Sequence, residues 1–307
     1  MSVAFLFPGQ GSQAPEMLHM LPDHPAVRRT FDEVNQCLSQ NVLDLDSDTA
    51  LQSTLSVQLA LFISGVAMSR VLVEGGVQPE AVAGMSVGTF AAAVQSGTIS
   101  LSDAVHLVRQ RAGMMMKLYP KGYGLGAIVG LTERQVAALV GEVHTPQTPV
   151  YVANINAACQ IVIAGSDEAI DQVLRAAQKS GARKAERLPV SVPSHCPLLE
   201  PVAEALTERL RTMTLQPPNL IYVGNVSARP LRSAEDIAVD LAGNIAHGVR
   251  WQDATTVLEE LGCRLFLELP PGHVLTELAR EAFPNVRTVA VGESSLKYLL
   301  SLVAETS

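Results

Sequence analysis

Ala83-Gly84-Met85-Ser86-Val87-Gly88 places a serine between two glycines, where an apolar run meets a helical one. Residues 79–83 predict a short buried strand, and residues 89–95 predict a helix that stops at Gly97. This G-x-S-x-G pattern is typical of a nucleophile elbow, because a sharp turn lifts the serine Oγ clear of the backbone and the glycines let neighbouring chain pass close. The start of the helix then offers free N–H groups to a developing oxyanion. The alternative is a Gly/Ser turn without chemistry.

The elements around this turn predict an α/β fold with a mostly parallel sheet, because strands and helices alternate. Residues 3–7 form an apolar strand that ends in a glycine-containing loop at 8–13, whose backbone N–H groups can turn inward. Helical patterns follow at 26–38, at 57–73 and from Ser102, as N-cap, to about 118.

The middle of the chain has a different order of elements. Residues 121–192 read as β-α-β-β-α-β, the ferredoxin-like order, with Thr132 and Gln135 in a capping-box pattern at the first helix. We therefore predict an α/β-hydrolase-like core from 1–120 and 193–307, with 121–192 inserted as a small subdomain.

Composition excludes several classes of protein. The 307 residues are 48% hydrophobic and 17% charged, which allows a large core, and the net charge of −8 argues against nucleic acid as a partner. Four scattered cysteines predict neither a zinc site nor a disulfide framework, but reduced thiols and a cytoplasmic location. We see no signal peptide and no membrane span, and the helix at 57–73 reads as a buried core helix.

A serine nucleophile needs a base, and seven histidines compete for that role. His195 stands out because Pro193 and Pro197 stiffen its turn where the inserted segment would rejoin the core. The alternative for His195 is a turn histidine packed on a proline ring. His247 is its main rival, although its neighbours suggest a surface loop.

Arg111 lies at the edge of an apolar helical surface near 105–116. Most arginines in such places extend along the surface toward water. The alternative is that its planar fork holds a carboxylate through two parallel hydrogen bonds.

Five motifs occur together in one order: Phe7-Pro8-Gly9-Gln10-Gly11-Ser12-Gln13, the Ser86 elbow, Gln110-Arg111, Val190-Ser191-Val192-Pro193-Ser194-His195-Cys196 and Glu268-Leu269-Pro270-Pro271-Gly272. With them the chain resembles, over essentially its whole length, the malonyl-CoA:acyl carrier protein transacylase family. The resemblance implies that Ser86 is the nucleophile and His195 the general base and then acid. It implies an oxyanion hole made by the N–H groups of Gln10 and Val87. It also implies that Arg111 clamps the malonyl carboxylate and that the backbone carbonyl of Asn244 orients His195.

The chain departs from the family pattern at several positions. The family elbow usually reads Gly-His-Ser-Leu-Gly-Glu, whereas Met85 precedes the serine here and Thr89 takes the last place. Asn244 stands where members often have Gln, and residues 156–160 differ from the usual Asn-Ser-Pro-Gly-Gln. Residues 17–25 and 119–124 look more like the malonyltransferase (epsilon) subunit of malonate decarboxylase.

The resemblance implies a ping-pong transfer of malonyl from malonyl-CoA to a carrier-protein thiol, with no bound cofactor or metal and no membrane or nucleic-acid partner. The carrier is either the carrier subunit of malonate decarboxylase or, as the alternative, the acyl carrier protein of fatty-acid synthesis. Two other functions remain open, a serine thioesterase or hydrolase and a docking subunit without catalysis. An acidic carrier would need basic contacts, and the candidates are Lys117, Lys121, Arg183, Lys184 and Arg187; a solvated charged surface is the alternative reading.

Overall fold

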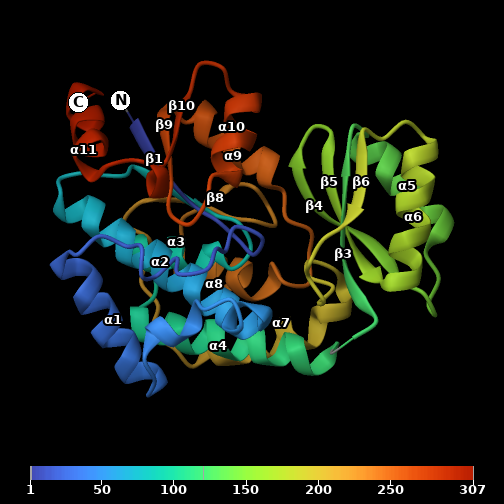
Figure 1. Ribbon diagram of the computed structural model, residues 1–307, viewed down its shortest axis with the longest axis horizontal. Helices are drawn as coiled ribbons and strands as arrows, with labels where there is room; N and C mark the ends of the chain where they lie inside the picture. Colours follow the sequence, from blue (N-terminus) through green and yellow to red (C-terminus); the bar gives the residue numbers. More distant parts are fainter. Residues whose placement is uncertain (1, 120, 307) are drawn as a thin grey trace.

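The computed structural model describes residues 2–119 and 121–306, which form two separate sheets (Figure 1). In this described part the larger sheet has the strand order β10-β9-β1-β2-β7-β8, and neighbours are parallel except for β7 and β8. Its strands are β1 (Ser2–Phe7), β2 (Ala81–Gly84), β7 (Ile221–Val223), β8 (Pro230–Leu231), β9 (Cys263–Glu268) and β10 (Arg287–Ala290). The prediction of an α/β fold with a mostly parallel sheet is confirmed.

Strand β1 shows why this sheet is buried on both faces. Val3, Phe5 and Phe7 belong to a core that includes helices α1 to α4, α7 and α8, whereas Ala4 and Leu6 belong to a second core with α9 and α10. A parallel strand covered on both faces is apolar along its length, as this one is. These helices are α1 (Pro25–Leu38), α2 (Thr54–Glu74), α3 (Gly88–Gln95), α4 (Leu101–Leu118), α7 (Glu200–Arg211), α8 (Ala234–Gly243), α9 (Trp251–Glu260) and α10 (Val274–Ala282).

Helix α2 lies at the centre of the first core. It is long and apolar enough to cross a membrane by length and composition, but 83% of its most apolar window is buried inside the fold. This is the placement expected of a core helix, in agreement with the sequence-based prediction for 57–73.

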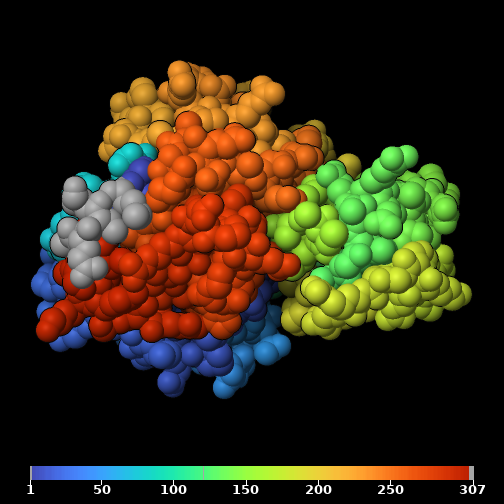
Figure 2. All heavy atoms as spheres, turned by 90° about the horizontal axis from the view of Figure 1, so that it is seen from above, coloured from blue at the N-terminus to red at the C-terminus, as the bar shows by residue number. Residues whose placement is uncertain are grey.

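The smaller sheet has the order β4-β5-β3-β6 with every neighbouring pair antiparallel. Its elements follow the predicted β-α-β-β-α-β order: β3 (Tyr123–Val129), α5 (Glu133–Val143), β4 (Val150–Ala157), β5 (Gln160–Ser166), α6 (Asp167–Lys179) and β6 (Lys184–Arg187). Helix α5 begins with the predicted capping box of Thr132 and Gln135. In the space-filling view this green-to-yellow segment stands beside the red and orange C-terminal part (Figure 2). The domain boundaries at 120/121 and 192/193 stay a proposal.

Several local predictions were wrong. Ser100, not Ser102, caps α4, because its side chain accepts the N–H of Asp103. Residues 183–192 are predicted as one strand, whereas β6 ends at Arg187 and the chain from 188 to His195 is an irregular strap. Helix α9 and strand β10 are not predicted from the sequence, whereas a final helix is, and the last element is α11 (Leu296–Thr306). Four short 3₁₀ turns complete the described elements: η1 (Val42–Leu45), η2 (Ala50–Gln52), η3 (Pro197–Leu199) and η4 (Val291–Glu293).

Candidate active site

The turn between β2 and α3 carries Ser86 in a left-handed backbone conformation, with φ of 55°. A non-glycine residue held there is strained by about 1–3 kcal/mol, and such strain is often found at functional sites. Two glycines make the turn possible. A Cβ at Gly84 would lie 2.2 Å from the carbonyl of Gly88, and a Cβ at Gly88 would lie 2.2 Å from the carbonyl oxygen of Phe7. The strand–turn–helix predicted for this segment is therefore present.

The loop after β1 packs directly on this turn. A Cβ at Gly9 would lie 2.7 Å from the carbonyl oxygen of Met85 and 3.4 Å from the Cβ of Ser86, so only glycine allows this approach. Gln10 follows Gly9, and Val87 follows Ser86. Both residues line the cavity that is described below. Within residues 2–119 and 121–306 the backbone N–H groups of Gln10 and Val87 donate to no acceptor. Two free N–H groups beside a serine can hold an oxyanion.

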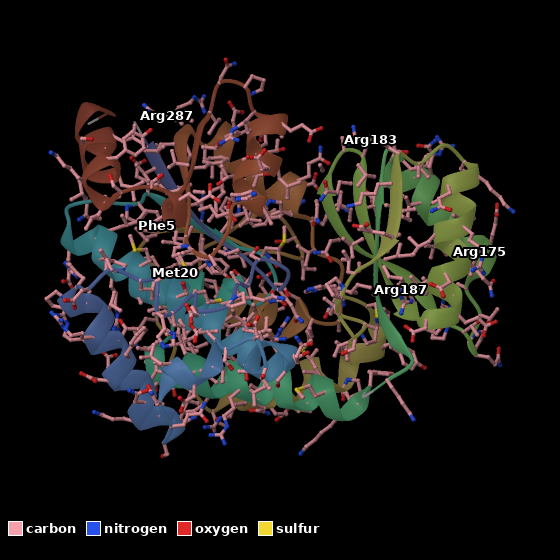
Figure 3. The ribbon with its side chains drawn as sticks, viewed as in Figure 1. Phe5, Met20, Arg175, Arg183, Arg187 and Arg287 are labelled. Carbon is pink, nitrogen blue, oxygen red and sulfur yellow. The ribbon has the colours of Figure 1, made fainter. Side chains whose placement is uncertain are left out.

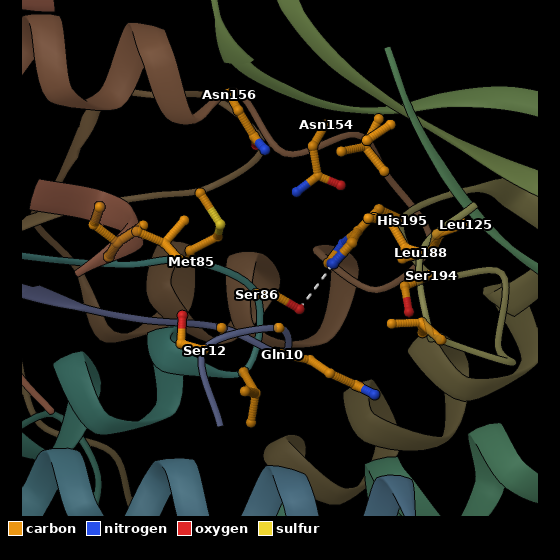
Figure 4. A pocket seen from close by; sticks show the side chains of 18 of the residues that line it. Gln10, Ser12, Met85, Ser86, Leu125, Asn154, Asn156, Leu188, Ser194 and His195 are labelled. Carbon is orange, nitrogen blue, oxygen red and sulfur yellow. Dashed lines mark hydrogen bonds between the residues drawn. The ribbon is translucent and has the colours of Figure 1, made fainter. Parts of the chain in front are cut away.

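His195 reaches Ser86 from the strap after β6. Its Nε2 lies 2.8 Å from Ser86 Oγ, the contact drawn in Figure 4. Its backbone N–H donates to the carbonyl of Ile245, and its Nδ1 lies 2.5 Å from the carbonyl oxygen of Asn244. Since a carbonyl only accepts, Nδ1 carries the proton and Nε2 is left free to accept the serine proton.

The pKa of His195 falls from 6.5 to about 3, chiefly because the ring is buried and also because the positive Arg111 is close; the Asn244 carbonyl acts in the opposite direction. The ring is therefore neutral at neutral pH and can act as a base. Asn244 is the C-cap of α8, so its carbonyl belongs to the negative end of that helix. A helix C-terminus stabilises a nearby cation, and it would favour the imidazolium that forms once His195 takes a proton.

Arg111 is fully buried in α4 and directed at the same hydroxyl. Its Nη2 donates to Ser86 Oγ at 3.1 Å, and its Nη1 donates to Gln58 Oε1 at 2.5 Å. Its Nε has no acceptor among the residues that the structure describes. Burial lowers the pKa of Arg111 to about 9, so the group is still a cation at neutral pH. A buried cation without a counter-ion is costly, which makes this a position where an anionic ligand would be favoured.

These groups open into a cavity of about 230 Å³ between the larger part of the fold and the smaller sheet. The loops after β1 and β2 contribute Gln10, Met85 and Ser86, helix α4 contributes Arg111, and the strap after β6 contributes His195. Strands of the smaller sheet contribute Leu125, Ala127, Asn154, Asn156, Gln160 and Val162. Asn154 and Asn156 face the Ser86–His195 pair across the cavity (Figure 4). The buried Asn156 Oδ1 has no hydrogen-bond partner among the described residues.

Two departures from the family pattern touch one another. Asn244 Nδ2 donates to Thr89 Oγ1 at 3.1 Å, and Thr89 Oγ1 donates to the carbonyl of Ser86 at 2.7 Å. Thr89 and Asn244 both depart from the family pattern, and their side chains are bonded to each other. No motif in the sequence indicates this contact. The same holds for Gln58, which bonds Arg111, and for Asn225, whose side-chain oxygen accepts the N–H of Ser86 at 2.8 Å.

Other candidates are not brought to the site. His247 is exposed, and its Nδ1 contacts the carbonyl of Gly243. Cys196 adjoins His195 in sequence, but burial raises the pKa of its thiol to about 12. Within the described part of the chain no three His, Cys, Asp or Glu side chains gather to hold a metal ion.

Two of the basic residues suggested for carrier binding are paired with neighbouring carboxylates. Arg187 pairs with Asp167, and Lys184 pairs with Glu186 at 2.6 Å. Arg183 and Arg187 lie at opposite ends of β6 (Figure 3). For Arg183, Lys184 and Arg187 this arrangement favours the alternative of a solvated charged surface.

Comparisons with known proteins point in one direction. The family model described as "Acyl transferase domain" matches residues 4–295. The malonyl CoA-acyl carrier protein transacylase of Escherichia coli K12 is 35% identical over 298 residues, which cover 95% of this chain and 96% of that protein. The acyl-carrier-protein S-malonyltransferase of Burkholderia pseudomallei superposes with a TM-score of 0.93 at 34% identity, covering 98% of this chain and all of that one. A malonyl-transacylase solved with a type II PKS acyl-carrier protein gives a TM-score of 0.93 at 33% identity, with full coverage of both chains.

Proposed function

The chain belongs to the acyl transferase domain family and, within it, to the malonyl CoA-acyl carrier protein transacylases, and on that premise we propose that it moves a malonyl group from CoA to a carrier-protein thiol. One observation carries the proposal: a single buried hydroxyl, Ser86 Oγ, is contacted by a neutral histidine and by a cation that pairs with no carboxylate among the described residues. The first contact supplies a base, and the second supplies a partner for the free carboxylate that distinguishes malonyl from acetyl.

In the first half of the proposed reaction, His195 Nε2 takes the proton of Ser86 as Oγ attacks the thioester carbon of malonyl-CoA. The carbonyl oxygen becomes an oxyanion that accepts hydrogen bonds from the N–H groups of Gln10 and Val87. Each such donor contributes about 3–4 kcal/mol in enzymes where it has been removed. When the C–S bond breaks, His195 returns its proton to the departing sulfur, and a malonyl-Ser86 ester remains.

In the second half, the carrier thiol gives its proton to His195 and its sulfur attacks the ester carbon. Collapse of this second tetrahedral intermediate breaks the C–O bond, and the proton returns to Ser86 Oγ. Arg111 pairs with the malonyl carboxylate throughout, so the charged acyl group is never buried alone.

The relatives favour an acyl carrier protein as the acceptor, which was the alternative in the sequence analysis. They give no support to the narrower assignment as the malonate decarboxylase subunit. That assignment rests on the sequence departures alone, among them Met85, which lines the cavity beside the nucleophile. Acceptor assays decide between them: an acyl carrier protein with a phosphopantetheine arm against a carrier subunit with a CoA-derived group.

The transfer itself is tested by intact mass spectrometry after brief mixing with malonyl-CoA. We expect a malonyl adduct on the wild type that a carrier thiol discharges, and no adduct on Ser86→Ala. Free CoA and malonate accumulating without a carrier would instead indicate a hydrolase. Carrier binding without any acylation would indicate a docking subunit.

A further inference from the structure

Asn225 lies directly behind the nucleophile and bonds both sides of its turn. Its Oδ1 accepts the backbone N–H of Ser86 at 2.8 Å, and its Nδ2 donates to the carbonyl of Gly84. These two backbone partners fix which end of the amide is which, because an N–H only donates and a carbonyl only accepts. The side chain is 1% exposed, so water does not compete for either bond.

We call these two hydrogen bonds of the Asn225 amide the clasp, and the geometry of the turn explains why they are needed. The parallel pairing of β2 with β1 ends at Gly84, so the N–H of Ser86 has no partner strand. Ser86 also has a φ of 55°, which the surrounding structure has to maintain. The amide of Asn225 supplies the missing acceptor and ties the end of the strand to the strained residue.

Asn225 is itself held by a buried carboxylate on α8. Asp240 Oδ1 accepts the backbone N–H of Asn225 at 2.8 Å and that of Val226 at 3.0 Å. A Cβ at Gly224 would lie 2.9 Å from the same oxygen, so the glycine lets the carboxylate approach. Burial raises the pKa of Asp240, and the two N–H bonds act against that rise.

The base is held by the same end of α8. Asn244, one turn beyond Asp240, accepts the Nδ1 proton of His195 through its backbone carbonyl. Its side chain also reaches the carbonyl of Ser86 through Thr89. The last turn of α8 is therefore bonded to the nucleophile through two routes and to the base through one.

We propose that Asn225 is a positioning residue for the proposed transfer, that Asp240 holds Asn225, and that the end of α8 thereby sets the distance between Ser86 Oγ and His195 Nε2. The inference rests on the proposed function, because it assigns how that site is kept in reacting geometry. Neither side chain lines the cavity, so neither contacts the acyl group.

The test compares four variants for single-turnover acylation by malonyl-CoA: Asn225→Ala, Asp240→Ala, Asp240→Asn and Asp236→Asn. A small misplacement of a nucleophile lowers rates by about 10²-fold, so we expect a fall of that size in Asn225→Ala with KM changed less than about twofold. Asp240→Asn keeps an acceptor oxygen and should retain most of the rate that Asp240→Ala loses. Asp236, an exposed carboxylate one turn earlier on α8, is the matched control and should leave the rate unchanged.

Each rate is divided by the fraction of folded protein, which near-UV circular dichroism measures. A substitution that only destabilises the fold then lowers the folded fraction and leaves the corrected rate unchanged. If Asn225→Ala does not fold, the comparison of the two Asp240 variants carries the test. A normal rate in folded Asn225→Ala, a change in KM alone, or an equal loss in both Asp240 variants would overturn the proposal.

A fluorophosphonate, which labels activated serines without regard to acyl group, separates this proposal from the proposed function. If malonyl-CoA fails to acylate the wild type but the probe labels Ser86, the transfer is wrong; slower labelling of Asn225→Ala would still support the clasp. If the probe does not label the wild type, both proposals fail.

Discussion

Arg111 directs its Nη2 at the hydroxyl of Ser86, at 3.1 Å. A cation in contact with this hydroxyl has two consequences. It favours a carboxylate ligand in the cavity, and, together with burial as the larger cause, it lowers the pKa of His195 on the other side of the same oxygen.

Arg111→Ala should separate malonyl from acetyl transfer. Removing one partner of a buried ion pair costs about 3–5 kcal/mol, so we expect kcat/KM for malonyl-CoA to fall by at least about 10²-fold. Acetyl-CoA carries no carboxylate and should lose far less. Both rates are measured on one preparation of the variant. An equal loss with both donors would remove the clamp assignment.

The pH profile of acetyl transfer should show the lowered pKa of the base. Since His195 titrates at about 3 in the free protein, kcat/KM should stay nearly constant from pH 8 to pH 5. A histidine at the ordinary value of about 6.5 would lose roughly thirtyfold over that range. Arg111→Met removes a positive charge that opposes protonation of His195. It should therefore raise the pKa of His195 and move the acid limb of the profile to higher pH. Arg111→Lys keeps the charge and is the control; a limb that moves equally in both variants would contradict the electrostatic cause.

Gln58→Glu should prevent Arg111 from binding the malonyl carboxylate. Gln58 Oε1 already accepts from Arg111 Nη1, and a carboxylate there would neutralise the guanidinium and repel the malonyl carboxylate. We expect the preference for malonyl over acetyl to fall by at least tenfold, about 1.4 kcal/mol. Gln52→Glu adds the same charge at an exposed position on the neighbouring turn and should leave the preference intact. An unchanged preference in Gln58→Glu would show that Arg111 does not read the carboxylate.

Two glycine substitutions should have opposite effects on stability. Gly88→Ala forces a methyl to within 2.2 Å of a backbone oxygen, so we expect a loss of about 1–3 kcal/mol or more in the free energy of unfolding. Gly113 lies inside α4, and a Cβ there meets nothing within 4 Å. Gly113→Ala should therefore gain about 0.5–1 kcal/mol. Urea titration followed by circular dichroism measures both, and a neutral Gly88→Ala would contradict the close approach of β1 to the elbow.

The sequence was most informative where a backbone conformation requires a particular residue type. The glycines around Ser86 and the capping box at Thr132 could be predicted because each residue type is required by a local conformation. The capping error at α4 arose because Ser100 and Ser102 are both good caps, and the choice depends on where the helix turns. Helix α9 and strand β10 were missed because their patterns are short and unremarkable without the neighbours that bury them.

Site residues that belong to a sequence motif could be predicted. Site residues that only the folded chain brings together could not. Gln58 lies 53 positions before Arg111, and Asn225 lies 139 positions after Ser86, and no spacing rule joins such pairs. The resemblance named Ser86, His195, Arg111, Gln10, Val87 and Asn244. The first five line one cavity, and Asn244 lies behind His195, whose Nδ1 its carbonyl contacts. Their catalytic roles stay proposals. The cytoplasmic location also stays a prediction.

The shared lining of the cavity has a consequence for how such proteins diversify. The hydroxyl, the imidazole and the guanidinium come from the outer parts of the chain, while the opposite wall comes from one continuous stretch between them. One stretch of gene therefore encodes the wall that faces Ser86 and His195. Recombination that replaces this stretch would leave Ser86 in place and change the shape of the cavity. New acyl preferences can therefore arise by exchange of one continuous segment as well as by point mutation.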